Sequence, residues 1–463
     1  MAILFVSNND WLSSGGETAF MSFFYQIGIQ GVIALVILMT KLMVTKINEN
    51  DKMLDMQLLF RIMPVIIILI SILQENTFTP QCITLFMLMQ GAMKINTDGL
   101  LDAKNKKIAF LITNFSNSGG TERVTSIIAN KLQENNWDCS IISCNDGINP
   151  KFDINKKINL ISLNGEKDKN PIIRKINNIK KLEKLYMENQ YDLIIAVDIA
   201  LFLYLLPLKK HKEVKLLAWE HFNCYTVQNS FSKISRKLAC KYADCIIVLG
   251  KNDLENYKNR YKNINRIEYI YNPLAIDITN SSNLKNNNVI AVGRLEDQKG
   301  FDYLIKAWEQ VEKKHPNWNL NIYGNGSKKD ELLKLIEDKK LKTVKINNFA
   351  NNIKEKYQES SIFVLSSRYE GFGLVLLEAQ ACGLPCISFN CKEGPAEIID
   401  DGINGYLVEC YDYMQLANRI NELIENQKKL KEFAKQAKKD LYRFDPETVY
   451  NNWENLLNNI MKG

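Results

Sequence analysis

The segment IFVLSSRYEGFGLVLLE, residues 362–378, predicts a buried strand, a glycine-containing turn and the beginning of a helix. Its first four residues are all apolar, as in a strand that is covered on both faces. The two glycines allow the backbone to approach a ligand closely, and the free N–H groups at the helix N-terminus suit a phosphate group. The glycine spacing alone does not distinguish such a site from an ordinary turn with Glu370 and Glu378 in solvent.

Short apolar runs alternate with helical patterns on both sides of this segment, from Lys106 onward. Continuous apolar strands separated by amphipathic helices indicate parallel sheets covered on both faces. Asn272-Pro273 and the polar stretch 280–288 divide the strands into two series, which indicates two Rossmann-like domains facing a cleft. The predicted strands are 108–113, 138–143, 159–163, 193–197, 214–219 and 245–249, then 289–292, 320–323, 344–346, 362–365 and 385–388.

We therefore expect an α/β protein with an N-terminal domain at residues 105–275 and a C-terminal domain at residues 276–445. The remaining residues, 446–463, form a predicted helix that packs back on the first domain. Its apolar positions recur at helical spacing: Val449, Trp453, Leu456, Leu457 and Ile460.

The composition of the 463 residues excludes a mainly disordered chain, because 46% of them are hydrophobic. The 59 Lys and Arg exceed the 52 Asp and Glu, which gives a net charge of +7. The ten Cys contain no Cys-x-x-Cys pair, and neither they nor the three His show the spacing of zinc ligands. We expect reduced, mostly buried thiols and no metal site.

Residues 1–100 differ from the rest, with five basic and seven acidic side chains and three long apolar runs at 23–44, 58–73 and 82–93. A bilayer crossing takes about 20 apolar residues. The segment is therefore a predicted all-α membrane segment of two or three helices. Lysines after the first and third runs place the rest of the chain on the cytoplasmic side. Alternatively, one or two runs cross and the others are interfacial or buried helices.

The turn at Ser366–Glu378 resembles the E-x7-E signature of the family 4 retaining glycosyltransferases, which have the GT-B fold. Other landmarks of that family occur in the same order between residues 106 and 460. They are the glycine loop Gly119–Arg123, the basic diphosphate-binding stretch Val292–Gly300, the second glycine turn Tyr323–Gly326, and the later segments Gly383–Pro385, Glu393–Ile399 and Asp401–Gly405.

The resemblance implies roles for these residues. Arg294 and Lys299 would neutralise the leaving diphosphate, Glu370 would bind the transferred sugar and Glu378 the ribose. His221, after a predicted strand, would lie near the reacting sugar, although a lone His there is as often structural. Further donor-binding positions are Gly293, Gly324, Gly371, Phe372, Gly373 and Leu374, and the acceptor or phosphate loop contains Gly119, Gly120 and Glu122.

The resemblance also implies the substrates. A hexose or N-acetylhexosamine would move with retention from a nucleoside diphosphate sugar, expected to be a UDP-sugar, to a lipid-linked oligosaccharide of capsule or O-antigen type. No Asp-x-Asp occurs in the chain, so the expected reaction is metal-independent and needs no cofactor. The basic, amphipathic segment 171–189 favours an anionic membrane as partner, although a packed helix with a solvated face is more common. No motif for nucleic-acid binding accompanies the charge.

Two other functions stay open. Asn9-Asp10-Trp11, Gly15-Gly16 and residues 75–81 resemble the end of an O-antigen or capsule polymerase. The protein would then be a membrane glycan assembly protein whose soluble part only binds nucleotide sugar. A GT-B sugar-nucleotide epimerase or phosphorylase is the second alternative. For the transferase we expect the inner membrane as location, with the catalytic domains in the cytoplasm.

Overall fold

The computed structural model describes residues 106–165, 170–226, 230–276, 281–350 and 352–462. The predicted membrane segment at residues 1–100 lies outside these ranges and stays a prediction. Within the described ranges, none of the helices combines the length and the apolar character that a bilayer crossing requires.

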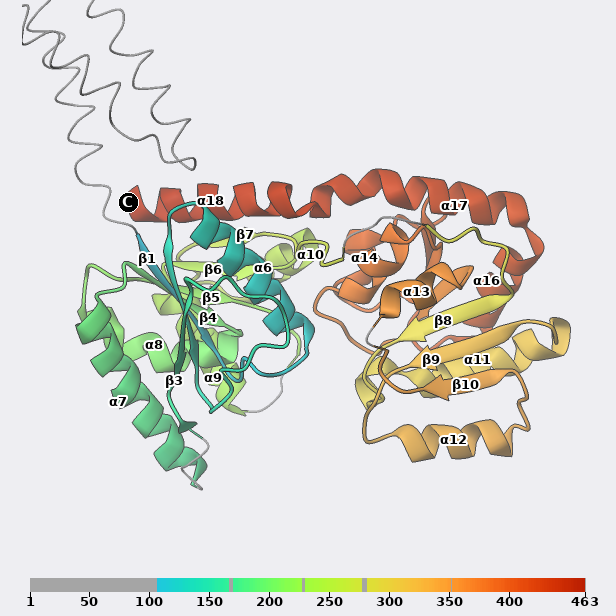
Figure 1. Cartoon of the computed structure of the whole chain (residues 1–463), viewed down its shortest axis with the longest axis horizontal. Coiled ribbons are helices and arrows are strands. Elements are labelled where there is room, and N and C mark those ends of the chain that lie inside the picture. The colour runs from blue at the N-terminus through green and yellow to red at the C-terminus, as the bar shows by residue number, and fades with distance from the viewer. Residues whose placement is uncertain (1–105, 166–169, 227–229, 277–280, 351, 463) are drawn as a thin grey trace, which may run out of the picture. The chain divides into compact units, whose positions relative to one another are not determined.

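The described part of the chain is built on two parallel sheets (Figure 1). The strand order is β3-β2-β1-β4-β5-β6-β7 in the first sheet and β10-β9-β8-β11-β12-β13 in the second. We call the parts around them the first and the second domain. The first sheet contains β1 (Lys107–Ile112), β2 (Asp138–Ser143), β3 (Asn159–Ser162), β4 (Leu193–Val197), β5 (Lys215–Trp219), β6 (Cys245–Val248) and β7 (Ile267–Tyr269). The second contains β8 (Asn288–Val292), β9 (Asn319–Tyr323), β10 (Val344–Asn347), β11 (Ile362–Leu365), β12 (Cys386–Phe389) and β13 (Gly405–Val408).

Helices connect most successive strands and cover both faces of the first sheet. Alternate residues of β1 belong to separate hydrophobic clusters: Phe110 packs in the cluster with α6, and Leu111 in the cluster with α7. The first domain has α6 (Gly120–Glu134), α7 (Pro171–Asn189), α8 (Phe202–Leu205), α9 (Ser230–Tyr242) and α10 (Lys251–Arg260). The second has α11 (Phe301–Lys314), α12 (Lys329–Asp338), α13 (Ile353–Gln358), α14 (Leu374–Ala381), α15 (Pro395–Ile398), α16 (Tyr413–Glu425) and α17 (Gln427–Lys439). The predicted alternation of strands and helices is thus confirmed except between β2 and β3, which no helix separates.

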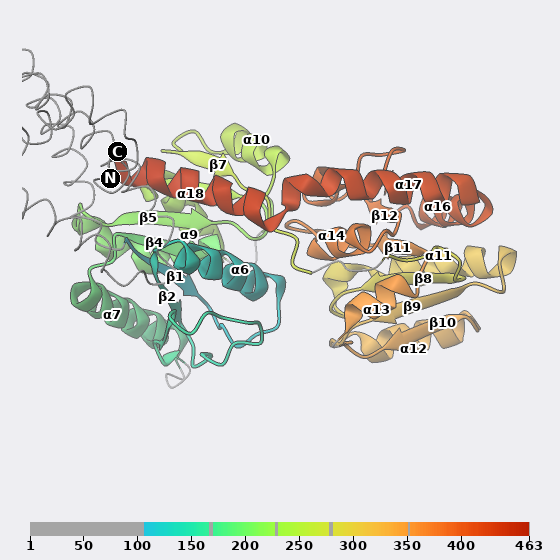
Figure 2. The same cartoon turned by 45° about the horizontal axis from the view of Figure 1, so that its top comes forward.

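The last helix, α18 (Pro446–Lys462), lies along the first domain, as Figure 2 shows in red. Its apolar face is buried, and the ring of Trp453 lies 4.6 Å from the ring of Trp219 at the end of β5. The chain therefore passes between the domains twice. The two passages contact each other, because the Leu274 N–H donates to the Phe444 carbonyl over 2.7 Å.

Two edge strands, β7 and β13, were not predicted. β7 has three residues, one of them charged, and none of them is fully buried. β13 begins at Gly405, where a Cβ atom would lie 2.4 Å from the carbonyl oxygen of Cys386 on β12. Short strands with a charge or a glycine lack the continuous apolar pattern that marks a central strand.

Candidate functional site

The glycine turn between β11 and α14 lies at the carboxyl end of the second sheet. Gly373 has φ of 94°, a left-handed value that favours glycine, and α14 begins at the next residue. A Cβ atom at Gly371 would lie 2.0 Å from the carbonyl oxygen of His221, which belongs to the first domain. The two domains therefore touch at this turn, and a side chain at residue 371 would separate them.

Glu370, in the turn, is buried and already paired with a cation. Its Oε1 accepts hydrogen bonds from the Lys299 ammonium over 2.5 Å and from the Ser367 hydroxyl over 2.6 Å. The Lys299 side chain passes under Gly293, whose Cβ position would be 3.1 Å from its Cδ. The structure thus brings together the predicted sugar-binding carboxylate and one of the two predicted diphosphate-binding cations.

Arg294 lies apart from this pair and is exposed. Its Nη2 donates to the Gln298 side chain over 3.0 Å, and Gln298 in turn donates to the Tyr369 carbonyl over 3.1 Å. The guanidinium is therefore tethered to the same glycine turn through one neutral side chain. It forms no ion pair with the residues that the structure describes, and it is accessible to a ligand.

Glu378, the second predicted carboxylate, is held by a different set of contacts from Glu370. Its Oε1 lies 2.5 Å from Arg123 Nη1 of the first domain, and its Oε2 accepts from the Tyr357 hydroxyl over 3.1 Å. Burial raises the pKa of Glu378, and Arg123 and Tyr357 act against that rise. Each of the two predicted carboxylates is thus buried with its own cation.

The predicted first-domain loop packs on the beginning of α14. A Cβ atom at Gly120 would lie 2.8 Å from Cδ1 of Leu374, and one at Gly119 would lie 2.6 Å from Oε2 of Glu122. Glu122 is buried and accepts from the Asn117 side chain over 3.4 Å. Gly324 directly follows β9. A Cβ atom at this position would lie 1.8 Å from the Gly293 carbonyl oxygen, so the close approach of these two turns requires glycine.

His221 presents its backbone, not its ring, to the glycine turn. Its ring lies 4.3 Å from the ring of Trp219, and its Nε2 has no partner among the described residues. Burial lowers the pKa of His221 to about 3, so the imidazole is neutral at physiological pH. Asn223, which the sequence reasoning missed, donates from Nδ2 to the Glu370 carbonyl over 2.9 Å.

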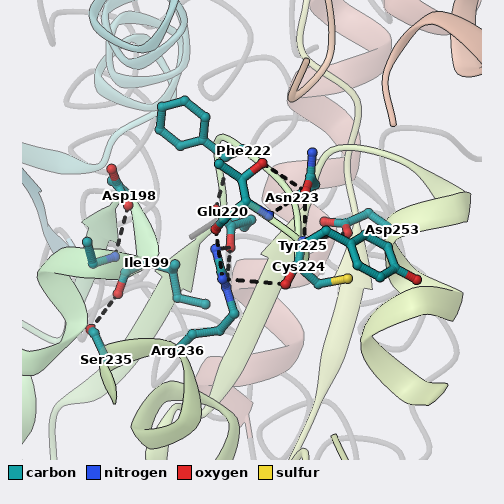
Figure 3. A network of polar contacts seen from close by, with 12 residues as sticks. Asp198, Ile199, Glu220, Phe222, Asn223, Cys224, Tyr225, Ser235, Arg236 and Asp253 are labelled. Atoms are coloured by element: carbon teal, nitrogen blue, oxygen red, sulfur yellow. Dashed lines mark hydrogen bonds and ion pairs between the residues drawn. The ribbon is translucent and has the colours of Figure 1, made fainter. Parts of the chain in front are cut away.

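A buried polar network holds this part of the first domain (Figure 3). Glu220, which is 0% exposed, contacts Arg236 Nη2 over 2.9 Å and accepts from the Tyr257 hydroxyl over 2.5 Å. Asp253 accepts from the Cys224 N–H over 3.0 Å. The carboxyl groups of Glu220 and Asp253 therefore fix the segment from residue 220 to 226, which carries His221 and Asn223.

A cavity of about 1040 Å³ opens beside the glycine turn and is lined by both domains. Its walls combine cations, aromatic rings and amides, a mixture suited to a polar ligand with sugar rings. They consist of Phe222, Asn223, Tyr225, Thr226, Arg294, Gln298, Arg368, Tyr369, Asn390, Cys391, Lys392, Leu407, Glu409, Cys410 and Tyr411. A smaller cavity of about 340 Å³ at the beginning of α17 contains none of the predicted site residues. Within the described ranges, no cluster of three or more His, Cys, Asp or Glu could hold a metal ion.

The carboxyl ends of two parallel sheets thus meet at a glycine turn that holds buried carboxylates paired with basic residues. Residues 118–277 match the family described as Glycosyltransferase Family 4, and residues 276–440 match the one described as Glycosyl transferases group 1. The chain therefore belongs to the group 1, or family 4, glycosyltransferases. It is 32% identical over 362 residues to an uncharacterized glycosyltransferase of Haemophilus influenzae, covering 76% of this chain and 100% of that protein. It is also 32% identical over 370 residues to the amylovoran biosynthesis glycosyltransferase AmsD of Erwinia amylovora, covering 76% and 99%.

Solved structures have the same fold. A mutant of Staphylococcus aureus TarM in complex with Fondaparinux, alpha-GlcNAc-glycerol and UDP has a TM-score of 0.66 at 18% identity, covering 76% of this chain and 100% of that one. Anabaena HepE in complex with UDP has a TM-score of 0.63 at 22% identity, covering 76% and 100%. These likenesses confirm the predicted GT-B fold of the described domains.

Proposed function

We propose that the protein is a retaining, metal-independent glycosyltransferase that extends a lipid-linked oligosaccharide in bacterial surface polysaccharide synthesis. The donor would be a nucleoside diphosphate sugar, expected to carry UDP, and the transferred group a hexose or N-acetylhexosamine. The observation that carries the proposal is the Lys299–Glu370 pair at the glycine turn, beside a cavity lined by both domains. A relative from Campylobacter jejuni is named as an N-acetylgalactosaminyltransferase acting on an undecaprenol-linked glycan. It is 26% identical over 358 residues, which cover 98% of that protein.

The pairing of Lys299 with Glu370 supports a role for both in transfer. An incoming diphosphate carries more negative charge than one carboxylate. It would therefore accept some of the hydrogen bonds of the Lys299 ammonium, which has three donor positions. Glu370 would then accept hydrogen bonds from hydroxyls of the transferred sugar. Arg294 is exposed and faces the same cavity, so it can reach the diphosphate as well.

In the proposed reaction the bond between the anomeric carbon and the diphosphate oxygen breaks, and a bond to the acceptor oxygen forms on the same face. The acceptor proton goes to the departing diphosphate. Lys299, Arg294 and the N-terminus of α14 would stabilise the charge that develops on that leaving group. The imidazole of His221 is buried and neutral, so it does not supply a proton.

A donor screen with the full-length protein in membranes tests this proposal. UDP- and GDP-sugars are supplied with native lipid extract and EDTA, and both nucleoside diphosphate release and label in the lipid are followed. We expect release with one donor, label in the lipid, and a loss of at least about tenfold in Glu378→Ala, since a charge-assisted contact to the ribose is removed. Donor binding without release or labelling would instead support the assembly protein that only binds nucleotide sugar.

The first half of α7 supports a membrane partner. Leu182 and Tyr186 are buried, but Ile172, Ile173 and Ile176 are 69%, 50% and 47% exposed. The buried positions of α7 therefore begin at Asn178, and the residues before it are exposed or half-buried. The Lys175 ammonium lies 3.4 Å from the ring centroid of Phe231 on α9, and on that helix Ile234 is 53% exposed. Exposed isoleucines among lysines fit insertion into an anionic membrane surface.

Replacing Ile172 and Ile173 together by Ser is expected to raise the KM for a vesicle-embedded acceptor about tenfold. The reason is that two apolar side chains are no longer transferred from water into the membrane surface when the protein binds. Turnover of a short-chain, water-soluble acceptor should not change. The control is Leu333→Ser on α12, where the side chain is 44% exposed. Equal effects on both acceptors would contradict the proposed membrane contact.

A further inference from the structure

Arg123 is the residue of the predicted glycine loop to which no role has been given. It lies in the first turn of α6, and its side chain crosses to the second domain. One guanidinium nitrogen, Nη1, lies 2.5 Å from Oε1 of Glu378, and the other, Nη2, donates to the Ala275 carbonyl between the domains. The Arg123 side chain is 25% exposed and that of Glu378 is 7% exposed.

The contacts of Glu378 with Arg123 and Tyr357 leave some of its hydrogen-bond acceptor positions unused. A carboxylate has about four acceptor positions on its two oxygens. Arg123 uses one of them and the Tyr357 hydroxyl another. Tyr357 is itself fully buried, so the carboxylate is held from two sides and cannot rotate freely. The positions that remain are enough for two hydroxyl groups of a ribose.

We propose that Arg123 is a donor-positioning residue, which holds Glu378 as an oriented carboxylate for the ribose, so that recognition of the nucleotide requires the first domain. The inference rests on the proposed function, in which Glu378 binds the ribose. Arg123 itself need not touch the nucleotide. It acts through the carboxylate, and it links ribose binding to the contact between α6 and α14.

Charge explains why the contact matters. A buried carboxylate without a cation takes up a proton, because desolvation disfavours the charged form. Burial already raises the pKa of Glu378, and Arg123 is the main influence that lowers it. Without the guanidinium, the carboxyl group would be protonated over a wider pH range. A protonated carboxyl group is a weaker acceptor for ribose hydroxyls than a carboxylate.

The test compares binding of UDP and 2′-deoxy-UDP to the full-length protein, or of GDP and 2′-deoxy-GDP if the donor screen selects guanine. The variants are Arg123→Gln, Arg123→Lys and Glu378→Gln. In Arg123→Gln we expect UDP to bind about tenfold more weakly and 2′-deoxy-UDP to change less than about threefold, because only the charge-assisted ribose contact is lost. Arg123→Lys, which keeps the charge, should recover most of the preference for UDP.

The pH dependence is a second readout that a merely structural role would not move. In Arg123→Gln, affinity for UDP should rise with pH as Glu378 loses its proton, while the wild-type affinity stays level over the same range. If Arg123→Gln weakens both nucleotides by the same factor at every pH, Arg123 only joins the domains and the inference is wrong. If Glu378→Gln leaves the preference for UDP unchanged, the proposed role of Glu378 fails first, and the inference fails with it.

Discussion

Lys299→Met is expected to lower turnover about a hundredfold to a thousandfold, because a positive charge is removed from a partly buried position beside the diphosphate on which negative charge develops. Methionine has nearly the length of lysine, so the space under Gly293 stays filled and no cavity forms. The effect should fall mainly on kcat if Lys299 stabilises the leaving group more strongly in the transition state than in the bound donor. Steady-state kinetics with the donor found in the screen would measure it.

The control for this prediction is Lys313→Met on α11. That lysine is 66% exposed and paired with Glu309 over 3.3 Å, far along the chain from the glycine turn. It should leave kcat unchanged, since exposed ion pairs contribute little. A loss of less than about fivefold in Lys299→Met would contradict a role at the leaving group, given the size of such effects. Lys299 would then be only the structural partner of Glu370.

Much of the fold could be predicted because it is encoded locally. A strand such as β4, with all five residues buried, has a continuous apolar sequence, and the helices between strands have apolar positions at helical spacing. The edge strands β7 and β13 could not be predicted in this way. They are short, and their conformation depends on a neighbouring strand more than on their own residues.

The candidate site was predictable only as a set of residues. The pattern identified Glu370, Glu378 and Lys299, since their types and spacing in the chain match a known family. It did not identify which side chains contact each other. The pair Arg123–Glu378 joins residues 255 positions apart in different domains, and such contacts leave no local signal. Asn223 was missed for the same reason, although it lies two residues after His221.

A second large effect is expected at Arg236, in the buried network of the first domain. Arg236→Met would leave the fully buried carboxyl group of Glu220 without its cation. Removing one partner of a buried ion pair costs about 3–5 kcal/mol. The segment from residue 220 to 226 should lose order first, because Glu220 also accepts from the Phe222 N–H over 3.2 Å. Amide hydrogen exchange in that segment should become at least about a hundredfold faster.

The double variant Glu220→Gln/Arg236→Met separates charge from packing. A glutamine amide oxygen can still accept from the Tyr257 hydroxyl, and no unpaired charge remains, so slow exchange should largely return. Lys258→Met, which removes an exposed pair with Glu255 on α10, serves as control and should change nothing. If the double variant exchanges as fast as Arg236→Met, the cost comes from lost contacts of the Arg236 side chain, including its hydrogen bond to the Thr226 carbonyl over 3.1 Å, and not from the buried charge.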